Sequence, residues 1–442
     1  MMENVNVKRA ETLAEMLKNF NPRPLDEDTL PLFYCDNTMP VRMGKIGNPM
    51  RGLFDACMMP LSKNAHLLAG HRGCGKSTEL FNLKQQFQKE QYPVMMVQAE
   101  LDLNMHLADC WDIMFFITKA LFEIAKENEI ELSPDMIQNV FDYLNQEIEI
   151  TTENSDSARI DANAGGSVSI NLAGLFKLFT SIKSDLEFGT QKREVLKEKV
   201  TKQPSEWLRY IKEISDIIMR QMDGKQPIII FEGLDKIQPY ERAFDIFRHE
   251  ILLKMPFPII YSFPISLIYD HRYGSLSLYN RHVLPMIKIS NVDKTPNLDG
   301  IEIIRQIIEK RADLQLFDED ALNEMITKTG GVLRHLFECI ITAARYATWR
   351  DATKIEYQDA IGGLSKLSAE TLTLQIEMSD YPDLAKIHDD INYRKGIDKK
   401  SVLLKLIQAS VILEYRNGDR WHDLHPLIAD FLRKQGVIDV EN

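Results

Sequence analysis

The chain has few of the features that mark secreted, membrane-spanning or zinc-binding proteins. None of its apolar runs approaches the roughly 18–20 residues that a membrane-spanning helix needs. The opening residues, MMENVNVKRAETLAEML, lack the apolar core of a signal peptide. We therefore expect a cytoplasmic protein with no membrane span.

Cysteine is scarce and widely spaced. The 442 residues include five cysteines, an odd number, and no two of them form a CxxC pair. This usage argues for a reducing compartment and against a zinc site. Cys74 falls inside a glycine-rich motif, where we expect it to fill space rather than to sense the redox state.

Basic residues are outnumbered by acidic ones. The 53 Lys and Arg residues face 65 Asp and Glu residues, which gives a net charge of −12. This balance disfavours broad binding to nucleic acid, although a local basic face is compatible with it. The length is sufficient for two or three domains with a sizeable core.

One stretch carries a phosphate-binding pattern. Gly70, Gly75, Lys76 and Ser77 stand as G-x-x-x-x-G-K-S, the P-loop. Glycines let the backbone wrap around phosphates, and the loop amides and the following helix N-terminus point at the anion. We expect Lys76 to reach the β and γ phosphates and Ser77 to hold Mg²⁺. The expected nucleotide-binding residues are Gly70, His71, Arg72, Gly73, Cys74, Gly75, Lys76, Ser77 and Thr78.

Apolar runs around this motif predict an α/β sheet. Leu67–Ala69 is a short buried strand in this interpretation, and residues 77–90 have the spacing of a helix. The run 226–231 is apolar on both faces, which is typical of a central parallel strand covered by helices. Further strands are expected at 93–97, 258–261 and 283–289, and further helices at 107–127 and 205–222.

Polar residues follow two of these strands. The run 226–231 leads into Glu232-Gly-Leu-Asp235, and the run 258–261 ends at Ser262. Acidic residues at the carboxyl end of a strand beside the P-loop strand are placed to handle Mg²⁺ and the attacking water. We expect Glu232 to meet the metal, and Asp235 and Ser262 to orient the water or contact the γ-phosphate.

Residues 1–60 form a polar segment that leads into the P-loop. They include Phe33, Tyr34 and Arg42. Such a segment can wrap the base of a bound nucleotide, but we expect a plain surface loop.

Residues 128–203 are less regular and suggest an insertion between strands. Val168, Ile170 and Leu172 alternate like a strand, whereas the residues from Leu172 to Phe179 recur at helical spacing. The pattern does not decide between the two. We expect the insertion to pack on its own domain rather than on a membrane or a partner.

The last third of the chain predicts a helical lid and a small terminal module. Residues 298–363 have helical spacing, interrupted at Gly330-Gly331, after which Arg334 opens a helix. The module follows as helices at 383–393 and 399–408, a strand at 409–415, a hairpin turn at Asn417-Gly418, a return strand, and a helix at 425–432. This order is that of a winged helix.

Taken together, these motifs resemble the P-loop ATPases of the AAA+/STAND group, near its origin-recognition and NACHT-type branch, which includes ATPases of bacterial defence. GHRGCGKSTEL is similar to the P-loop of that group, and IIIFEGLDKI looks like its acidic Walker B strand end. The resemblance implies that Ser262 is the sensor-1 residue and Arg334 the sensor-2 arginine. Arg281 lies where an arginine finger is often found. The likeness covers about residues 30–435 apart from the insertion.

The fold that the resemblance implies is a P-loop NTPase parallel sheet with helices on both faces, followed by a helical lid and a C-terminal winged helix. The expected divisions are a lead-in at 1–60, the ATPase domain at 61–297, the lid at 298–368 and the winged helix at 369–442.

The function that we expect is an ATP-driven molecular switch that uses Mg²⁺. Lys76 and Arg334 would meet the phosphates, and the state of the γ-phosphate would set the binding of a protein partner or self-assembly. Glu232 stands where the related motif has aspartate, and its longer side chain predicts slow hydrolysis.

Two alternatives are a DNA-binding loader or regulator and a small-molecule kinase. The first depends on basic residues on or before the second helix of the terminal module: Arg394, Lys395, Lys399, Lys400 and Lys405. We favour protein contact for this module because residues 370–442 carry more acid than base. Neither an acceptor site for a kinase nor an LSGGQ-like stretch of an ABC-type ATPase occurs in the sequence.

Overall fold

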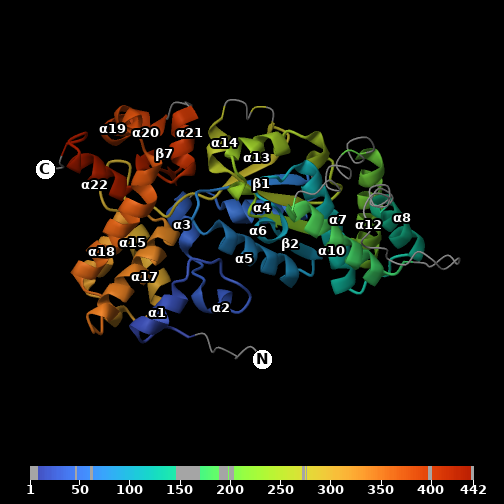
Figure 1. Ribbon diagram of the computed structural model, residues 1–442, viewed down its shortest axis with the longest axis horizontal. Coiled ribbons are helices and arrows are strands. Elements are labelled where there is room, and N and C mark those ends of the chain that lie inside the picture. Colours follow the sequence, from blue (N-terminus) through green and yellow to red (C-terminus); the bar gives the residue numbers. More distant parts are fainter. Residues whose placement is uncertain are drawn as a thin grey trace.

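A five-stranded parallel sheet lies at the centre of the computed structural model (Figure 1). The structure describes residues 8–44, 47–59, 63–145, 170–188, 198, 204–270, 274, 276–396 and 401–439. The strands are β1 (Ala65–Ala69), β2 (Val94–Gln98), β3 (Ile228–Glu232), β4 (Ile259–Phe263) and β5 (Asn280–Val283). Their order is β2-β3-β4-β1-β5, and every pairing is parallel. The predicted α/β sheet is therefore confirmed.

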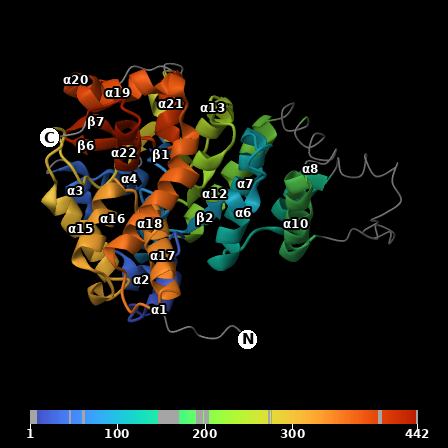
Figure 2. The same ribbon diagram turned by 60° about the vertical axis from the view of Figure 1, so that its left-hand side comes forward.

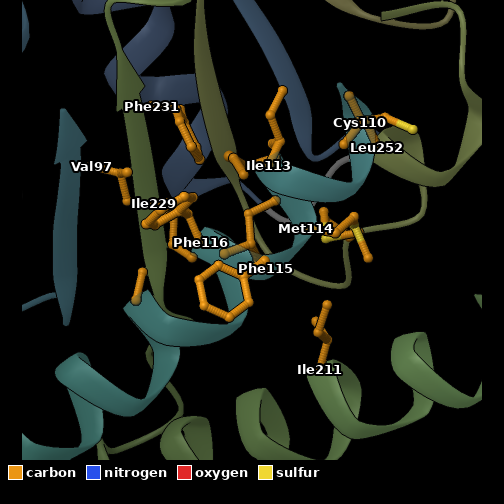
Figure 3. Close-up of a cluster of buried hydrophobic side chains, with 14 of the residues drawn as sticks. Val97, Cys110, Ile113, Met114, Phe115, Phe116, Ile211, Ile229, Phe231 and Leu252 are labelled. Carbon is orange, nitrogen blue, oxygen red and sulfur yellow. The ribbon is translucent and has the colours of Figure 1, made fainter. Parts of the chain in front are cut away.

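Helices cover both faces of this sheet, as the doubly apolar strand β3 predicts. Side chains of β3 alternate between the two faces: Ile229 and Phe231 contribute to one core cluster, and Ile228 and Ile230 to the other. The first face packs against α7 (Cys110–Glu127) and α12 (Pro204–Gln221), as Figure 3 shows for the side chains around Phe116. The second packs against α4 (Pro49–Met58) and α5 (Lys76–Lys89).

The described part of the insertion is helical. It forms α8 (Pro134–Asn145) and α10 (Leu172–Phe188), so the helical alternative holds from Leu172 onward, while Val168 lies outside the described residues. Phe179 of α10 packs edge-on against Phe115 of α7, with ring centroids 5.6 Å apart. These helices lie at the end of the molecule opposite the C-terminal module (Figure 1).

The predicted strand at 283–289 is wrong in its position. β5 ends at Val283, where it was expected to begin, and the chain then leaves the sheet. The residues that follow are apolar because they are buried between the P-loop and the C-terminal module: the amide of Leu284 donates to the carbonyl of Ala69, and that of Met286 to the carbonyl of Glu414. Because this segment is buried between two parts of the molecule, its residues are as apolar as those of a central strand.

The helical lid and the C-terminal module share one hydrophobic core, which includes Ile304 and Leu336 from the first and Ile407 and Ile428 from the second. The two lie side by side in both views (Figures 1 and 2). The lid helices are α15 (Leu298–Glu309), α16 (Glu319–Lys328), α17 (Leu333–Trp349) and α18 (Tyr357–Leu367). The module consists of α19 (Tyr381–Asp389), α20 (Ile391–Lys395), α21 (Ser401–Gln408), β6 (Ile412–Asn417), β7 (Asp419–Leu424) and α22 (Pro426–Lys434).

The predicted order of elements in this module is confirmed except that the helix expected at 383–393 is divided at Asp390 into α19 and α20. Gly418 lies in the hairpin turn at φ +79°. The assignment of the module as a winged helix stays a prediction, as do the four domain boundaries. The N-terminal helix α1 (Leu13–Asn19) packs on the lid, where Phe20 meets Phe337 edge-on at 5.5 Å.

The remaining helices are short: α2 (Leu30–Phe33), α3 (Thr38–Met43), α6 (Ala99–Asp102), α13 (Tyr240–Phe247) and α14 (Ile265–Tyr269). Over the described ranges, no helix combines the length and apolar character that crossing a membrane requires.

Candidate nucleotide site

The P-loop joins the end of β1 to the start of α5. Gly73 and Gly75 have φ values of +79° and +94°, which residues with a Cβ rarely adopt. Gly75 is the N-cap of α5 and makes no side-chain cap hydrogen bond. The amides of the first turn of α5 therefore face the loop, in the arrangement that suits a bound anion.

The Lys76 ammonium is paired with the second acid of the predicted motif. Its Nζ donates to Asp235 Oδ2 at 2.6 Å and to the Gly70 carbonyl at 3.3 Å. Both side chains are about 5% exposed or less. Burial raises the pKa of Asp235, but the Lys76 ammonium outweighs burial, so this pKa is lowered overall. Burial likewise opposes the charge of Lys76, yet Asp235 raises its pKa, and the two groups form a charged pair.

Ser77 and Glu232 form the neighbouring contact. Ser77 Oγ donates to Glu232 Oε1 at 2.6 Å, and Lys236 Nζ lies 3.8 Å from the same oxygen. Hydroxyl and carboxylate oxygens are the ligands that Mg²⁺ prefers, and the ion usually completes its shell with phosphate and water. The two side chains therefore fit a nucleotide-bound Mg²⁺. Among the described residues there is no group of three or more His, Cys, Asp or Glu that would hold a metal by itself.

Ser262 lies behind these groups rather than in the cavity. It is fully buried, and its Oγ accepts the amide hydrogen of Leu234 at 2.8 Å. The hydroxyl thereby holds the turn that carries Asp235. Its predicted contact with the γ-phosphate or the attacking water stays a prediction.

A cavity of about 340 Å³ adjoins the P-loop and is strongly cationic. Seven basic side chains line it against three acidic ones, in a chain whose net charge is −12. The basic residues are Arg23, Arg42, Arg72, Lys76, Lys236, Arg311 and Arg334; the acidic ones are Glu79, Glu100 and Asp235. A local positive potential of this kind attracts polyanions.

The lead-in forms a wall of this cavity, contrary to the expectation of a plain surface loop. Phe33 and Tyr34 line it, and Phe33 is 4% exposed. Arg42 is also buried, and its Nη2 donates to the Cys74 carbonyl at 2.8 Å, which fixes the P-loop from outside. The sequence could not show this because hydrophobic spacing in a short, polar segment does not reveal what the segment packs against.

Two predicted arginines differ in position. Arg334 lines the cavity at the start of α17, and its amide approaches the Gly73 carbonyl at 3.4 Å. Arg281 lies on the edge strand β5, paired in register with Leu67, and does not line the cavity. A role for Arg281 as an arginine finger towards another copy stays a prediction.

The C-terminal module touches the P-loop directly, a contact that sequence reasoning missed. The amide of Glu414 in β6 donates to His71 Nε2 at 2.8 Å. Burial lowers the pKa of His71 to about 3, so the ring is neutral and able to accept. Gln408 Nε2 donates to the Asp235 carbonyl oxygen at 3.3 Å, and Gln408 Oε1 accepts from Ser266 Oγ at 2.9 Å. These partners lie far apart in the chain, and no local pattern links them.

The basic group proposed for DNA contact is only partly at the surface. Arg394 is buried: its Nη1 donates to the Val292 carbonyl at 2.7 Å and lies 3.8 Å from Asp423. Arg394 therefore gives no support to the DNA-binding alternative, because its charge is used inside the module. Lys395 and Lys405 are exposed, and Lys399 and Lys400 lie outside the described residues.

Neither a family model nor a curated protein matches the chain. Solved structures similar to it include a Walker-type ATPase of Pyrococcus abyssi, at 13% identity and a TM-score of 0.42 over 94% of this chain and 99% of that one. The ORC2 protein of Aeropyrum pernix is 11% identical, with a TM-score of 0.41 over 93% of this chain and 97% of that one. Domain III of the Thermotoga maritima replication initiation protein DnaA is 12% identical, with a TM-score of 0.37 over 78% of this chain and 98% of that one.

Membership of the AAA+/STAND group, and of its defence branch in particular, stays a prediction.

Proposed function

We propose that this protein is a Mg²⁺-dependent, slowly hydrolysing ATPase that acts as a nucleotide-controlled switch. The observation that carries the proposal is the pairing of P-loop and acidic motif beside a cationic cavity, which Lys76, Ser77 and Asp235 line and behind which Glu232 lies buried. Lys76 contacts Asp235 at 2.6 Å, and Ser77 contacts Glu232 at 2.6 Å. A P-loop that faces two acidic residues is the arrangement used for transfer of a γ-phosphoryl group to water.

The chemistry follows from competition for the Lys76 ammonium. A γ-phosphate bound to Lys76 would share or displace the contact with Asp235. The freed Asp235 Oδ2 could then orient a water molecule and accept its proton. Arg72 and Arg334, which line the same cavity, would offset the remaining phosphate charge. Mg²⁺ held by Ser77 and Glu232 would supply further charge neutralisation on the phosphates.

The slow rate is proposed from Glu232. Its side chain is one methylene longer than that of the aspartate expected there, and its carboxylate reaches the Ser77 hydroxyl directly. Mg²⁺ tolerates little departure from octahedral geometry. A ligand that approaches too closely would therefore misplace the phosphate for in-line attack, where positioning supplies most of the catalysis.

The output of the switch is proposed to be the C-terminal module. Its contacts end on His71 in the P-loop and on the backbone of Asp235, so both nucleotide-facing segments hydrogen-bond to it. Movement of either segment on phosphate binding would break or remake those bonds. A partner that binds the module would then read the nucleotide state.

Replacement of Lys76 tests the site. In Lys76→Met, ATP affinity measured by calorimetry should fall by at least about tenfold, because a charged contact to the phosphates is lost. Lys89→Met, at the exposed end of the same helix, should bind ATP like the wild type.

Lys76→Met also leaves Asp235 buried and unpaired, so the unfolding temperature should be recorded alongside. Ser77→Ala avoids this problem and should weaken Mg²⁺-dependent ATP binding. Wild-type affinity in folded Lys76→Met would contradict the proposed site.

A further inference from the structure

Arg311 is a buried cation that lines the same cavity as Lys76. It follows α15 and is 5% exposed. Its guanidinium lies between two aromatic rings, 5.2 Å from the centroid of Phe33 and 4.8 Å from that of Phe337. One nitrogen, Nη1, donates to the Phe33 carbonyl at 3.2 Å and to the Ile307 carbonyl at 2.9 Å.

The other N–H groups of Arg311 are not used by the protein. Nε and Nη2 have no hydrogen-bond partner within the described ranges, and no carboxylate there lies within ion-pair distance of this guanidinium. Burial lowers the pKa of Arg311 to about 10, so the group remains charged at neutral pH. Nε and Nη2 are not sealed inside the protein, and a positive charge with unused donors beside a cavity favours a ligand that accepts hydrogen bonds.

The surroundings indicate what that ligand is. The apolar part of the cavity lining includes Phe33, Ile307 and Phe337, and all three contact Arg311. A nucleotide with its phosphates on Lys76 would extend its base towards these walls. Arg42 lines the same cavity, but its Nη1 and Nη2 both donate to backbone carbonyls. Arg42 Nε is unpaired but sealed from the cavity, whereas Arg311 keeps both Nε and Nη2 unused by the described residues.

We propose that Arg311 selects the nucleobase by donating N–H groups to an acceptor atom of a purine ring. The inference rests on the proposed nucleotide site and adds the ligand class that it prefers. Adenine and guanine present ring-nitrogen acceptors on a two-ring base, which reaches further from the ribose than the single ring of cytosine with its N3 and O2 acceptors. The flat aromatic and aliphatic walls would hold the base while Arg311 fixes its edge.

A purely structural role would use only part of the side chain. Nη1 already links the lead-in, through Phe33, to the lid, through Ile307. That link accounts for Nη1 of an arginine at this position, but it uses neither Nε nor Nη2. The two roles make different predictions for a ligand that has phosphates and no base.

The test measures binding of ATP, GTP, CTP and inorganic tripolyphosphate by calorimetry to the full chain and to Arg311→Met. We expect the wild type to bind at least one purine nucleotide more tightly than CTP or tripolyphosphate. Arg311→Met should lose about ten- to hundredfold in affinity for that nucleotide, the effect of a hydrogen bond to a charged donor. Its affinity for tripolyphosphate should be unchanged. Arg305→Met is the matched control: Arg305 lies on α15, the helix that Arg311 follows, and pairs with Glu319, so this change should alter neither affinity.

Two results would overturn the proposal: undiminished purine binding by Arg311→Met, or an equal loss for purine and tripolyphosphate. If Arg311→Met does not fold, Arg311→Lys is tested instead, because it keeps the charge without the planar guanidinium. Arg311→Lys should show the same selective loss of purine affinity to a smaller degree. An equal loss for purine and tripolyphosphate in that variant would also overturn the proposal. Failure of the wild type to bind tripolyphosphate and every nucleotide would instead contradict the proposed nucleotide site.

Discussion

Glu232 and Asp235 lie three residues apart, yet the structure gives them different partners. Glu232 accepts from the Ser77 hydroxyl, whereas Asp235 accepts from the Lys76 ammonium. Sequence reasoning could assign both acids to the site because a buried β-branched strand that ends in acidic residues is a local pattern. It could not show that Ser262 lies behind them, because that position depends on how β4 pairs with β3 and on the turn that follows β3.

Replacing Glu232 by aspartate should raise hydrolysis. The shorter side chain leaves room for water between the carboxylate and the metal, as Mg²⁺ prefers. We expect single-turnover hydrolysis to rise by up to about tenfold, which corresponds to ~1.4 kcal/mol of barrier, with little change in ATP affinity. Glu213→Asp, on the exposed face of α12, is the matched control. Asp235→Asn should nearly stop hydrolysis. A Glu232→Asp rate no faster than wild type would show that Glu232 does not limit turnover.

Buried histidines make stability depend on pH. Burial lowers the pKa of His66 to about 4, with a smaller contribution from His282, whose own pKa burial lowers to about 4. Neither ring nitrogen of His66 has a hydrogen-bond partner within the described residues. A pKa below the unfolded value near 6.5 means that the fold prefers the neutral ring. The contribution of His66 is therefore complete above pH 6.5 and declines as the pH falls from 6.5 towards 4.

His66→Leu should flatten this dependence. The free energy of unfolding is measured by urea titration at pH 7.5, 6.5, 5.5 and 4.5. Between pH 6.5 and 4, its slope against pH should be smaller in His66→Leu than in the wild type by up to about 1.4 kcal/mol per pH unit. Taking the difference between the two proteins removes the titration of other groups. His106→Asn replaces an exposed histidine and should leave the slope unaltered. Identical slopes of unfolding free energy against pH for His66→Leu and wild type would refute the assignment of this pH dependence to His66.

At the scale of elements, the P-loop and α17 are in van der Waals contact. A Cβ built on Gly73 would lie 2.7 Å from the Cβ of Arg334. The sequence predicts the loop and the helix separately, because each has a local signal, a glycine motif for one and 3.6-residue spacing for the other. Their contact could not be predicted, because it depends on how the lid closes over the sheet. The same limit applies to the lead-in and to residues 284–289, whose burial comes from distant elements.

Gly73→Ala should separate the loop from the lid. The left-handed φ of +79° alone costs about 1–2 kcal/mol for an alanine, and the clash with Arg334 adds about 1–3 kcal/mol. We expect a lower unfolding temperature and an ATP affinity reduced by about tenfold. Gly224→Ala is the matched control, since its φ is +82° and, apart from Gly224 and its two chain neighbours, no described residue has an atom within 4 Å of the added carbon. Equal effects of the two changes on ATP binding would contradict a contact between loop and lid at the site.

At the scale of the whole molecule, parts that are distant in sequence converge on the phosphate-binding loop. The lead-in reaches it through Arg42, the lid through Arg334, and the C-terminal module through Glu414. The lid and the module also share one core, so they are expected to move together. Composition and spacing predicted the separate elements of the module, but not that its hairpin lies against the P-loop, because hydrogen bonds between residues 343 positions apart leave no local pattern.

The most direct test of a nucleotide-controlled switch is hydrogen exchange of β6 with ATP and with ADP. The amide of Glu414 depends on His71, so its exchange rate should differ between the two nucleotides by about fivefold, the effect of roughly one hydrogen bond. Helix α10, at the opposite end of the molecule, should exchange alike in both, and Lys76→Met should abolish the difference in β6. Identical exchange of β6 with ATP, with ADP and without nucleotide would contradict the coupling of the P-loop to the C-terminal module.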